Sequence, residues 1–415
     1  MNTAILAAGF LLAFITALCL TPLVARFARR KQWVDLPGGE RTVHKRPTPR
    51  AGGIAIILTF LFSTGYLVLA DQIFDLPLEI HAYIPSFALF LGSGIIAFTG
   101  LYDDAYGLGF KKKFLFQLIV AYGMYLAGFR VEVPYFFALE SDPYLQAALA
   151  LPLTLLWYLG IMNAINLIDG LDGLASGISL LAFVCLASIF ALQGQVALVP
   201  LAVVMIGALL GFLVYNFNPA SIFLGDTGSL FLGFMIATYA LQGAIHADPL
   251  VTLIVIGLAV GYPVMDTSLA FIRRLLEGNS PFAPDKDHVH HRVLRKLNYS
   301  IRRSVFALYS IQGFLCLTAF VIAFVPVQFM ILILSIAFVG VGLVLRYLGY
   351  LDVQSGLVLM RERMEDLMGE RVPRGNWQGS GDGAVSPLLE PMPAPSKKLR
   401  PETEEDRELV AHSAE

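Results

Sequence analysis

The chain has 415 residues, of which 57% are hydrophobic and only 14% are charged, and its formal net charge is -2. A soluble domain usually carries about 25% charged residues, so this composition excludes an ordinary soluble globular protein. The near-zero net charge gives no reason to expect binding to nucleic acid. The three cysteines lie far apart inside apolar runs, and their spacing shows neither a disulfide framework nor a metal motif.

Windows of about 20 apolar residues mark membrane-spanning helices. The sequence contains eleven, near residues 3–25, 52–70, 82–101, 113–129, 144–162, 173–192, 197–216, 222–243, 249–272, 304–326 and 328–349. The span from 113 is short and the last two adjoin at Pro326, which keeps a count of ten open. No basic residue precedes the first span, which favours an uncleaved helix over a secretory signal. The expected fold is an all-α polytopic membrane protein with about eleven transmembrane helices.

The basic residues predict an orientation for these helices. Segments 26–50, 102–113 and 273–303 and the chain from 346 onward together hold 28 of the 29 lysines and arginines, and only Arg130 falls on the opposite side. Cytoplasmic loops carry such an excess, so the N-terminus is expected outside and the C-terminus in the cytoplasm. Ten spans would break this alternation. Residues 1–351 would form the transmembrane domain, and 352–415, rich in Gly, Pro, Ser and charge, a largely disordered cytoplasmic tail.

Four polar clusters interrupt the apolar pattern, all on the predicted cytoplasmic side. The first is Asp103-Asp104, followed by Lys111, Lys112 and Lys113. Adjacent carboxylates repel each other, and a divalent cation or a basic substrate site would relieve that repulsion. An ordinary acidic pair at a solvent-exposed helix end is the alternative.

The second cluster repeats a polar residue at every third position: Asn163, Asn166, Asp169 and Asp172. Residues three apart on a helical turn share one face. Helix capping by Asn and Asp explains one or two of these residues but not four. The third cluster is Asp226 between Gly225 and Gly228, where a lone carboxylate suits an oxygen-liganded hard cation and the nearby Thr227 and Ser229 would donate to a phosphate. An N-cap aspartate is the alternative reading.

The fourth cluster is His288-Val289-His290-His291-Arg292. Its side chains supply donors for a diphosphate, although a zinc site or a plain basic patch beside the membrane are alternatives. The four clusters together indicate Mg²⁺ ligands, phosphate-binding groups and a membrane-embedded body. They predict a phosphoryl transfer in which at least one substrate is a lipid.

These motifs, in this order, resemble the polyprenyl-phosphate N-acetylhexosamine-1-phosphate transferases (glycosyltransferase family 4, the WecA/TagO/MraY-type enzymes). The resemblance covers about residues 1–350 and includes Val34-Asp35-Leu36-Pro37 and the stretch from Val43 to Gly53 in the first cytoplasmic loop. It implies ten or eleven helices, dependence on Mg²⁺ (with Mn²⁺ as an alternative) and a site facing the cytoplasm. A sugar-1-phosphate would pass from a UDP-N-acetylhexosamine to undecaprenyl phosphate in the bacterial inner membrane, with release of UMP.

The resemblance also implies roles for individual residues. Asp103 and Asp104 would be the catalytic pair, with Asp103 deprotonating or orienting the lipid phosphate, and Asn166 and Asp226 would hold the metal. The substrate-binding residues would be His44, Lys113, Asn163, Asp169, Asp172, His288, His290, His291 and Arg292.

The histidine pattern favours the branch that uses UDP-N-acetylglucosamine or a related sugar, because the muramoyl-pentapeptide branch typically has three consecutive histidines after a proline. The product would start a cell-envelope polysaccharide such as lipopolysaccharide O-antigen. A UDP-N-acetylmuramoyl-pentapeptide transferase of peptidoglycan synthesis is the first alternative. A membrane transporter with intramembrane carboxylates and a lipid-binding scaffold are weaker ones, and a homodimer stays open.

Overall fold

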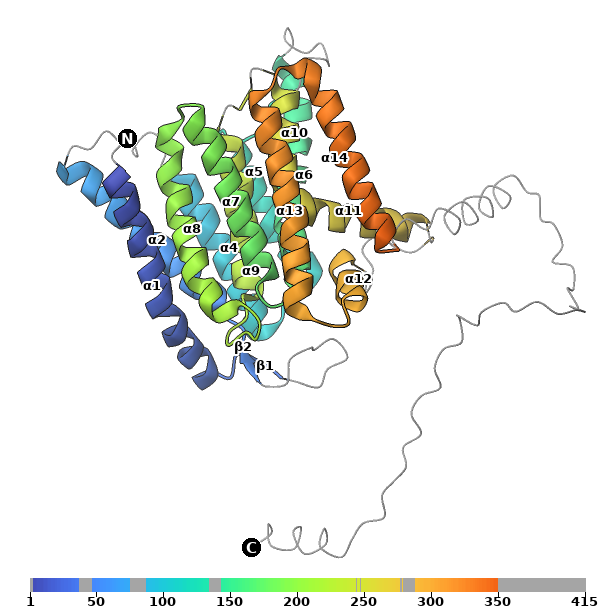
Figure 1. Cartoon of the computed structure of the whole chain (residues 1–415). Helices are drawn as coiled ribbons and strands as arrows, with labels where there is room; N and C mark the ends of the chain where they lie inside the picture. The colour runs from blue at the N-terminus through green and yellow to red at the C-terminus, as the bar shows by residue number, and fades with distance from the viewer. Residues whose placement is uncertain are drawn as a thin grey trace, which may run out of the picture. The chain divides into compact units, whose positions relative to one another are not determined.

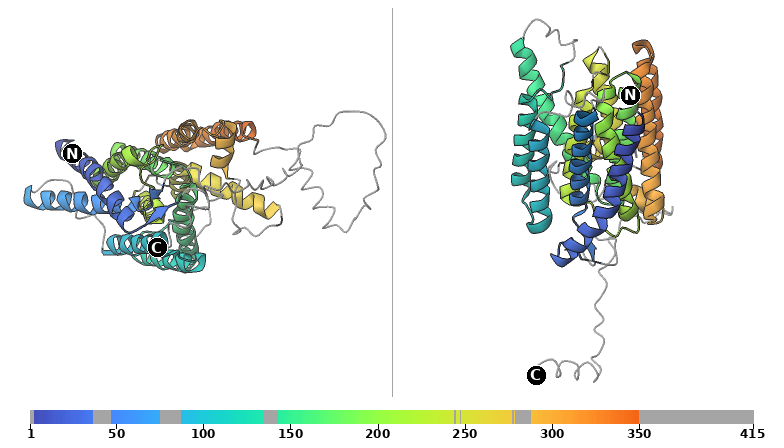
Figure 2. Two further views of the ribbon diagram at one scale, coloured as in Figure 1. Left: turned by 90° about the horizontal axis from the view of Figure 1, so that it is seen from below. Right: turned by 90° about the vertical axis from the view of Figure 1, so that its left-hand side faces the viewer.

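The computed structural model describes residues 3–36, 47–74, 87–133, 143–243, 245–246, 248–276, 278 and 288–349, which are almost entirely helical (Figure 1). The longer helices run side by side along a common direction (Figure 2, right). The elements are α1 Thr3–Arg30, β1 Val34–Asp35, β2 Thr48–Pro49, α2 Gly52–Phe74, α4 Phe87–Tyr106, α5 Phe110–Leu126, α6 Pro143–Ile168, α7 Leu174–Leu192, η2 Val196–Leu198, α8 Val199–Asn216, α9 Gly225–Gln242, α10 Pro249–Ala259, α11 Gly261–Leu276, α12 Val289–Lys296, α13 Ile301–Phe324 and α14 Val327–Tyr347.

The helices confirm an all-α polytopic membrane protein. Within the described residues, 7 helices are long and apolar enough to cross a membrane, and the bent pair of α10 and α11 adds an eighth candidate. The seven are α1, α2, α6, α7, α8 with η2, α13 and α14. The other three predicted spans correspond to α4, α5 and α9, which pack in the same bundle. The count of eleven spans and the orientation stay predictions, as does the tail, which lies outside the described residues.

The span expected near 249–272 is not one continuous helix. Helices α10 and α11 meet at an angle of 87°, and α11 runs off to the side of the bundle (Figure 2, left). Buried Gln312 of α13 joins the two halves, because its Nε2 donates to the Ala259 carbonyl (2.6 Å) and its Oε1 accepts from the Tyr262 amide (3.1 Å). Backbone groups freed at membrane depth need such partners, which explains how the break is tolerated.

Helix α9 lies at the centre of the bundle. Every residue from Gly225 to Ala240 is buried, and α2, α4, α6 and α7 all pack against it. A helix that is apolar all round is expected to be enclosed by others. Its first turn carries Asp226, so the chain places this carboxylate inside the bundle.

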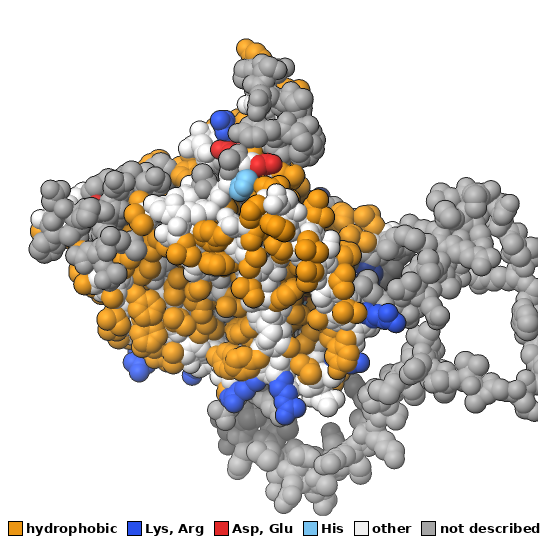
Figure 3. Space-filling model, turned by 45° about the horizontal axis from the view of Figure 1, so that its top comes forward, with side chains coloured by type: hydrophobic (Ala, Val, Ile, Leu, Met, Phe, Trp, Pro, Cys, Tyr) orange, Lys and Arg blue, Asp and Glu red, His pale blue; other side chains and the backbone are white. Residues whose placement is uncertain are grey.

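The face of the molecule shown in Figure 3 carries a broad apolar belt, with lysines and arginines gathered mainly along its lower edge. Helix α14 contributes strongly to this belt, because Ile331, Leu332 and Phe338 are all exposed on it. Large exposed apolar surfaces mark membrane or protein contacts, and the number of long apolar helices makes the membrane the natural surrounding.

Candidate active site

The chain before α2 is fastened to the segment before α9. Strands β1 and β2 pair antiparallel, and Arg50 continues as a bridge to Phe223. The Gly52 and Gly53 amides then donate to the carbonyls of Phe223 and Leu224, both at 2.9 Å. This pairing brings Arg50 to the first turn of α9, at the lower end of the bundle in Figure 1.

A close crossing of α4 and α9 places the paired aspartates. A Cβ on Gly100 would lie 2.5 Å from the Thr227 Cα, so only glycine allows the helices to come this near. One turn later, Asp104 accepts hydrogen bonds from the Asp226 amide (2.9 Å), the Thr227 amide (2.8 Å) and the Thr227 hydroxyl (2.7 Å). The first amides of a helix have no partner within the helix. Asp104 therefore caps α9, and Thr227 donates to it rather than to a substrate.

Two cations hold the carboxylates together. Arg50 Nε lies 3.2 Å from Asp104 Oδ1, and its Nη2 donates to Asp226 Oδ1 at 2.8 Å. Lys113 Nζ lies 2.5 Å from Asp103 Oδ2 and also contacts Asp226 Oδ2. The carboxylates of Asp103 and Asp226, from two different helices, thus converge on one cationic nitrogen. The structure brings Asp103, Asp104, Lys113 and Asp226 together as the sequence predicted.

Helix α6 contributes two amide side chains near this cluster, those of Asn163 and Asn166. Asn166 Nδ2 donates to the Ser229 hydroxyl (2.8 Å) on α9, which leaves the amide oxygen as the atom that it offers to a ligand. Asn163 Nδ2 donates to Gln117 Oε1 (2.9 Å) and to the Leu159 carbonyl (2.7 Å). Asn166 therefore lies beside the first turn of α9, whereas Asn163 joins α6 to α5.

The two aspartates of the same stretch do not continue the helical face that their spacing suggested. Helix α6 ends at Ile168, and Gly173 has a left-handed backbone (φ 77°), so Asp169 and Asp172 lie in a turn. Asp172 Oδ2 accepts from Asn218 Nδ2 (2.8 Å) and the Ala220 amide (3.0 Å). Asp172 therefore fastens the loop before α9.

Asp169 lies at the electrostatic centre of the cluster. Burial raises the pKa of Asp169 well above its ordinary value; Arg50 opposes this shift, and the negative charges of Asp226, Asp104 and Asp172 reinforce it. A cation bound nearby would favour the charged form of this carboxyl, as Arg50 already does.

The histidine cluster is built on a carboxylate of the bent helix. Asp266 of α11 uses both carboxylate oxygens. Its Oδ1 accepts from the Val289 amide at 2.7 Å and lies 3.4 Å from His288 Nδ1, and its Oδ2 pairs with His290 Nδ1 at 3.0 Å. The His288 and His290 rings are stacked with centroids 5.5 Å apart. On the opposite edge, His290 Nε2 faces Gly170, since a Cβ there would lie 3.1 Å from it. His290 is therefore adjacent to the turn that carries Asp169.

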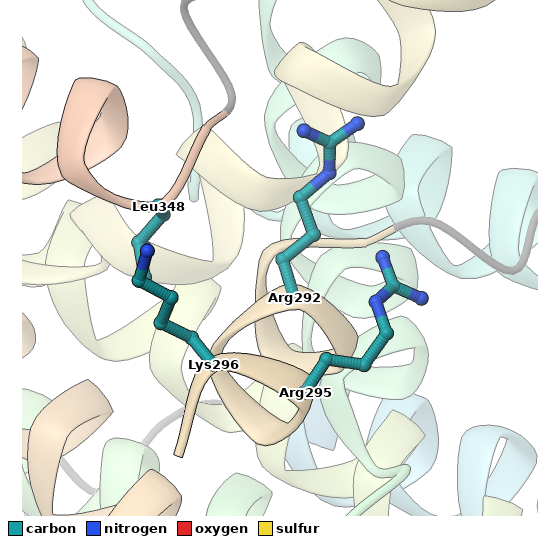
Figure 4. Close-up of a pocket in the computed structure, with 4 residues that line it drawn as sticks. All are labelled: Arg292, Arg295, Lys296 and Leu348. Carbon is teal, nitrogen blue, oxygen red and sulfur yellow. The ribbon is translucent and has the colours of Figure 1, made fainter. Parts of the chain in front are cut away.

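The last two residues of the histidine cluster are His291, whose ring centroid lies 4.2 Å from that of His290, and Arg292. Burial, followed by the neighbouring His290 and His288, lowers the pKa of His291 to about 4, so this ring is neutral near pH 7. Arg292 donates to the Gly349 carbonyl (2.6 Å) and lines a surface pocket of about 460 Å³ (Figure 4) together with Arg295, Lys296 and Leu348. His44, a predicted substrate-binding residue, lies outside the described residues.

The donor set around Asp226 fits a hard cation. The described residues hold no group of three or more His, Cys, Asp or Glu side chains placed to bind a metal by themselves. Mg²⁺ usually takes only one or two carboxylates and completes its shell with substrate phosphates and water. The carboxylate oxygens of Asp226 and Asp103 and the amide oxygen of Asn166 are ligands of that type.

Sequence reasoning missed two residues of this site. Arg50 stood in a stretch recognised only for its resemblance, and nothing local indicated that strand pairing carries it to Asp226. Asp266 was a lone acid inside an apolar run, which is itself a signal of function at membrane depth.

The chain is similar to known proteins over most of its length. The model of glycosyl transferase family 4 matches residues 86–244. A probable undecaprenyl-phosphate N-acetylglucosaminyl 1-phosphate transferase of Bacillus subtilis is 36% identical over 83% of this chain and 92% of its own length. A decaprenyl-phosphate N-acetylglucosaminephosphotransferase of Mycobacterium tuberculosis is 36% identical over 72% of this chain and 78% of its own. A phospho-N-acetylmuramoyl-pentapeptide-transferase of Staphylococcus carnosus is 29% identical over 68% of this chain and 88% of its own length.

Proposed function

The chain belongs to glycosyl transferase family 4, and we propose that it transfers N-acetylglucosamine-1-phosphate from UDP-N-acetylglucosamine to a polyprenyl phosphate. The membership bears out the resemblance seen in the sequence. The observation that carries the proposal is the convergence of Asp103 and Asp226 on Lys113 at the buried start of α9. The names of the two relatives at 36% identity support the choice of sugar and of a polyprenyl acceptor.

The reaction is a phosphoryl transfer. A phosphate oxygen of the lipid attacks the phosphorus that bears the sugar, its bond to the bridging oxygen breaks, and UMP leaves with that oxygen. Such transfers are accelerated by positioning and by neutralising charge. Lys113 and Arg50 supply positive charge at the carboxylate cluster, and as the substrates bind, their phosphates would compete with the carboxylates for these cations.

The structure favours different roles for the two adjacent aspartates. All of the contacts of Asp104 go to the start of α9 and to Arg50, so it positions Asp226. Asp103 accepts from the Leu108 amide and pairs with Lys113, from which a substrate can separate it. Asp103 is therefore the better candidate for the group that orients or deprotonates the acceptor phosphate.

The metal belongs to the same proposal. Asn166 and Asp226 would hold Mg²⁺, with Asp103 beside them, and the cation when bound would neutralise charge on the diphosphate. The convergence of the Asp103 and Asp226 carboxylates on Lys113 supports this assignment, because it brings oxygen ligands from two helices together.

We place the enzyme in the bacterial cytoplasmic membrane, with its site facing the cytoplasm, where a UDP-sugar is available. The distribution of basic residues in the sequence supports this orientation. Membrane lipid would cover the apolar belt of Figure 3.

One observation keeps the transporter alternative testable. Broken helices near substrate sites are typical of transporters, and α10 and α11 form such a break. The carboxylates, however, gather at helix ends on one side of the bundle, and the family relatives are transferases.

Release of UMP tests the proposal. Purified protein in detergent would be given polyprenyl phosphate and a panel of radiolabelled UDP-sugars, before and after EDTA and again after added Mg²⁺. UMP release and lipid-linked label are expected with UDP-N-acetylglucosamine, with loss in EDTA and recovery in Mg²⁺. Transfer only from UDP-N-acetylmuramoyl-pentapeptide would overturn the sugar assignment, and no transfer from any UDP-sugar would overturn the reaction class.

A further inference from the structure

We propose that Asp266 is the positioning residue of the histidine cluster: it holds His290, with His288 stacked on it, so that the Nε2 edge of His290 binds a phosphate of the UDP-sugar. The inference rests on the proposed function, because it names the residue that prepares one wall of the same site for its nucleotide donor. It assigns a role to a residue that lies in the bent helix α11 and is separate from the carboxylate cluster.

The contacts of Asp266 use both of its oxygens. Oδ1 accepts from the Val289 amide (2.7 Å) and lies 3.4 Å from His288 Nδ1, whereas Oδ2 pairs with His290 Nδ1 (3.0 Å). Asp266 is fully buried, and His290 is only 1% exposed. An unpaired carboxylate would be very costly here, so the surrounding donors fix its orientation, and the carboxylate in turn fixes theirs.

The pairing decides which edge of His290 is presented to the site. The two ring nitrogens differ, and a carboxylate on Nδ1 fixes the tautomer and the ring orientation. With Nδ1 on Asp266, Nε2 is the nitrogen that remains for a ligand. That nitrogen lies against Gly170, since a Cβ there would come within 3.1 Å of it, and Gly170 belongs to the turn that carries Asp169.

The break in the membrane helix explains why Asp266 can reach the histidines. Gln312 braces Ala259 and Tyr262 on either side of the break, and α11 then leaves the direction of α10 by 87°. A straight helix would carry position 266 along the bundle axis instead. The bend between α10 and α11 thus places the buried Asp266 carboxylate against His288 and His290.

A double-mutant cycle tests whether Asp266 acts through His290, with nucleotide binding as the measurement. Equilibrium binding of UDP-N-acetylglucosamine, without acceptor lipid, would be compared for wild type, Asp266→Asn, His290→Ala and the double variant, with melting temperature recorded in parallel. We expect Asp266→Asn to weaken binding about tenfold, as loss of the partner that orients a histidine commonly does. The double variant should bind no worse than His290→Ala, because Asp266 acts through that ring. In turnover, Asp266→Asn should raise KM for the UDP-sugar more than it lowers kcat.

Asp71→Asn is the matched control. Asp71 is also a buried acid in a membrane helix, but it lies 19 residues along α2 from Gly52, roughly 28 Å from the site at the usual helical rise. Its binding constant should equal that of wild type.

Three results would overturn the inference. Unchanged binding in Asp266→Asn with a lowered melting temperature would make Asp266 a structural clip for α12. Losses that add in the double variant would show that Asp266 and His290 act separately. If Asp266→Asn fails to fold, Asp266→Glu replaces it in the same cycle, and wild-type binding in that variant would overturn the need for this carboxylate position. Failure of the wild type to bind or use any UDP-sugar would instead refute the proposed function.

Discussion

The site has two walls that are built in opposite ways. The carboxylate wall, formed by Asp103, Asp104 and Asp226, faces the cations Arg50 and Lys113 and is partly open, since the Arg50 side chain is 45% exposed. The histidine wall, formed by His288 and His290 on Asp266, is closed and rests on a single buried acid.

The two walls would therefore meet a substrate in different ways. Ion pairs that are partly exposed are weakly held, so Arg50 can move to an incoming phosphate, whereas Lys113, with a side chain only 15% exposed, is held more firmly. Buried pairs are strongly held once both partners are present, so the histidine wall is arranged before the substrate arrives. The carboxylate wall is thus suited to charge rearrangement during transfer, and the histidine wall to recognition of the donor.

The largest expected effect comes from breaking the carboxylate wall at its centre. Asp226→Ala removes the carboxylate between Arg50 and Lys113 and the proposed metal ligand, so UMP release should fall by about 10³-fold or more, a loss typical of a central electrostatic group. Initial rates at saturating substrates would measure it. The control is Asp248→Asn, because Asp248 caps α10 at the Leu250 amide, and its rate should stay near wild type. Near-normal turnover in Asp226→Ala would show that the metal assignment is wrong.

The next prediction separates the adjacent aspartates. Asp103→Asn should lower turnover about 10²-fold with little change in UDP-sugar affinity, because its charge acts on the acceptor. Asp104→Asn should instead lower the free energy of unfolding by about 1–2 kcal/mol, because it disturbs the cap on α9. Activity and thermal melting of both variants would be measured together. Weaker UDP-sugar binding with unchanged turnover in Asp103→Asn would refute the catalytic role.

Much of the carboxylate wall could be predicted from sequence because its residues lie at helix ends. Long apolar windows locate those ends, and alternation of the windows across a membrane brings Asp103, Asn166 and Asp226 to one side. The role of Asp104 as a cap of α9 could not be predicted, since it depends on the close approach of α4 and α9 that Gly100 allows.

The histidine wall was only half predictable. The sequence identified its histidines but not the acid that holds them, because Asp266 is reached through a bend whose partner, Gln312, is distant in sequence. The turn after α6 was misjudged for a similar reason. Spacing of three residues suggested a helical face, but the helix ends at Ile168 and Asp172 bonds to the loop before α9.

A smaller effect concerns the pH dependence of stability. Since burial raises the pKa of Asp169 well above its ordinary value, the folded state binds a proton more tightly than the unfolded state. Its contribution to stability is therefore greatest below the unfolded pKa, near 3.8, and is lost as pH rises through the folded pKa. Asp169→Asn should raise the melting temperature at pH 7 to 8 and lose that advantage near pH 4, while activity falls. Asp172→Asn, whose oxygen bonds to Asn218 and Ala220, should show no such gain, and a pH-independent difference for Asp169→Asn would contradict the prediction.

The smallest expected effect concerns Arg292, which we place outside the histidine wall. The sequence predicted Arg292 as a phosphate ligand, but its guanidinium bonds to the Gly349 carbonyl in the open pocket of Figure 4. Arg292→Ala should therefore change the affinity for UDP-N-acetylglucosamine by less than about threefold, the size expected for a partly exposed charge, and Arg295→Ala should behave alike. The two affinities would be measured beside that of His290→Ala. A tenfold loss confined to Arg292→Ala would contradict this prediction and show that Arg292 binds the diphosphate. Both arginines line the same pocket, so the loss of one positive charge could not by itself explain a difference between the two variants.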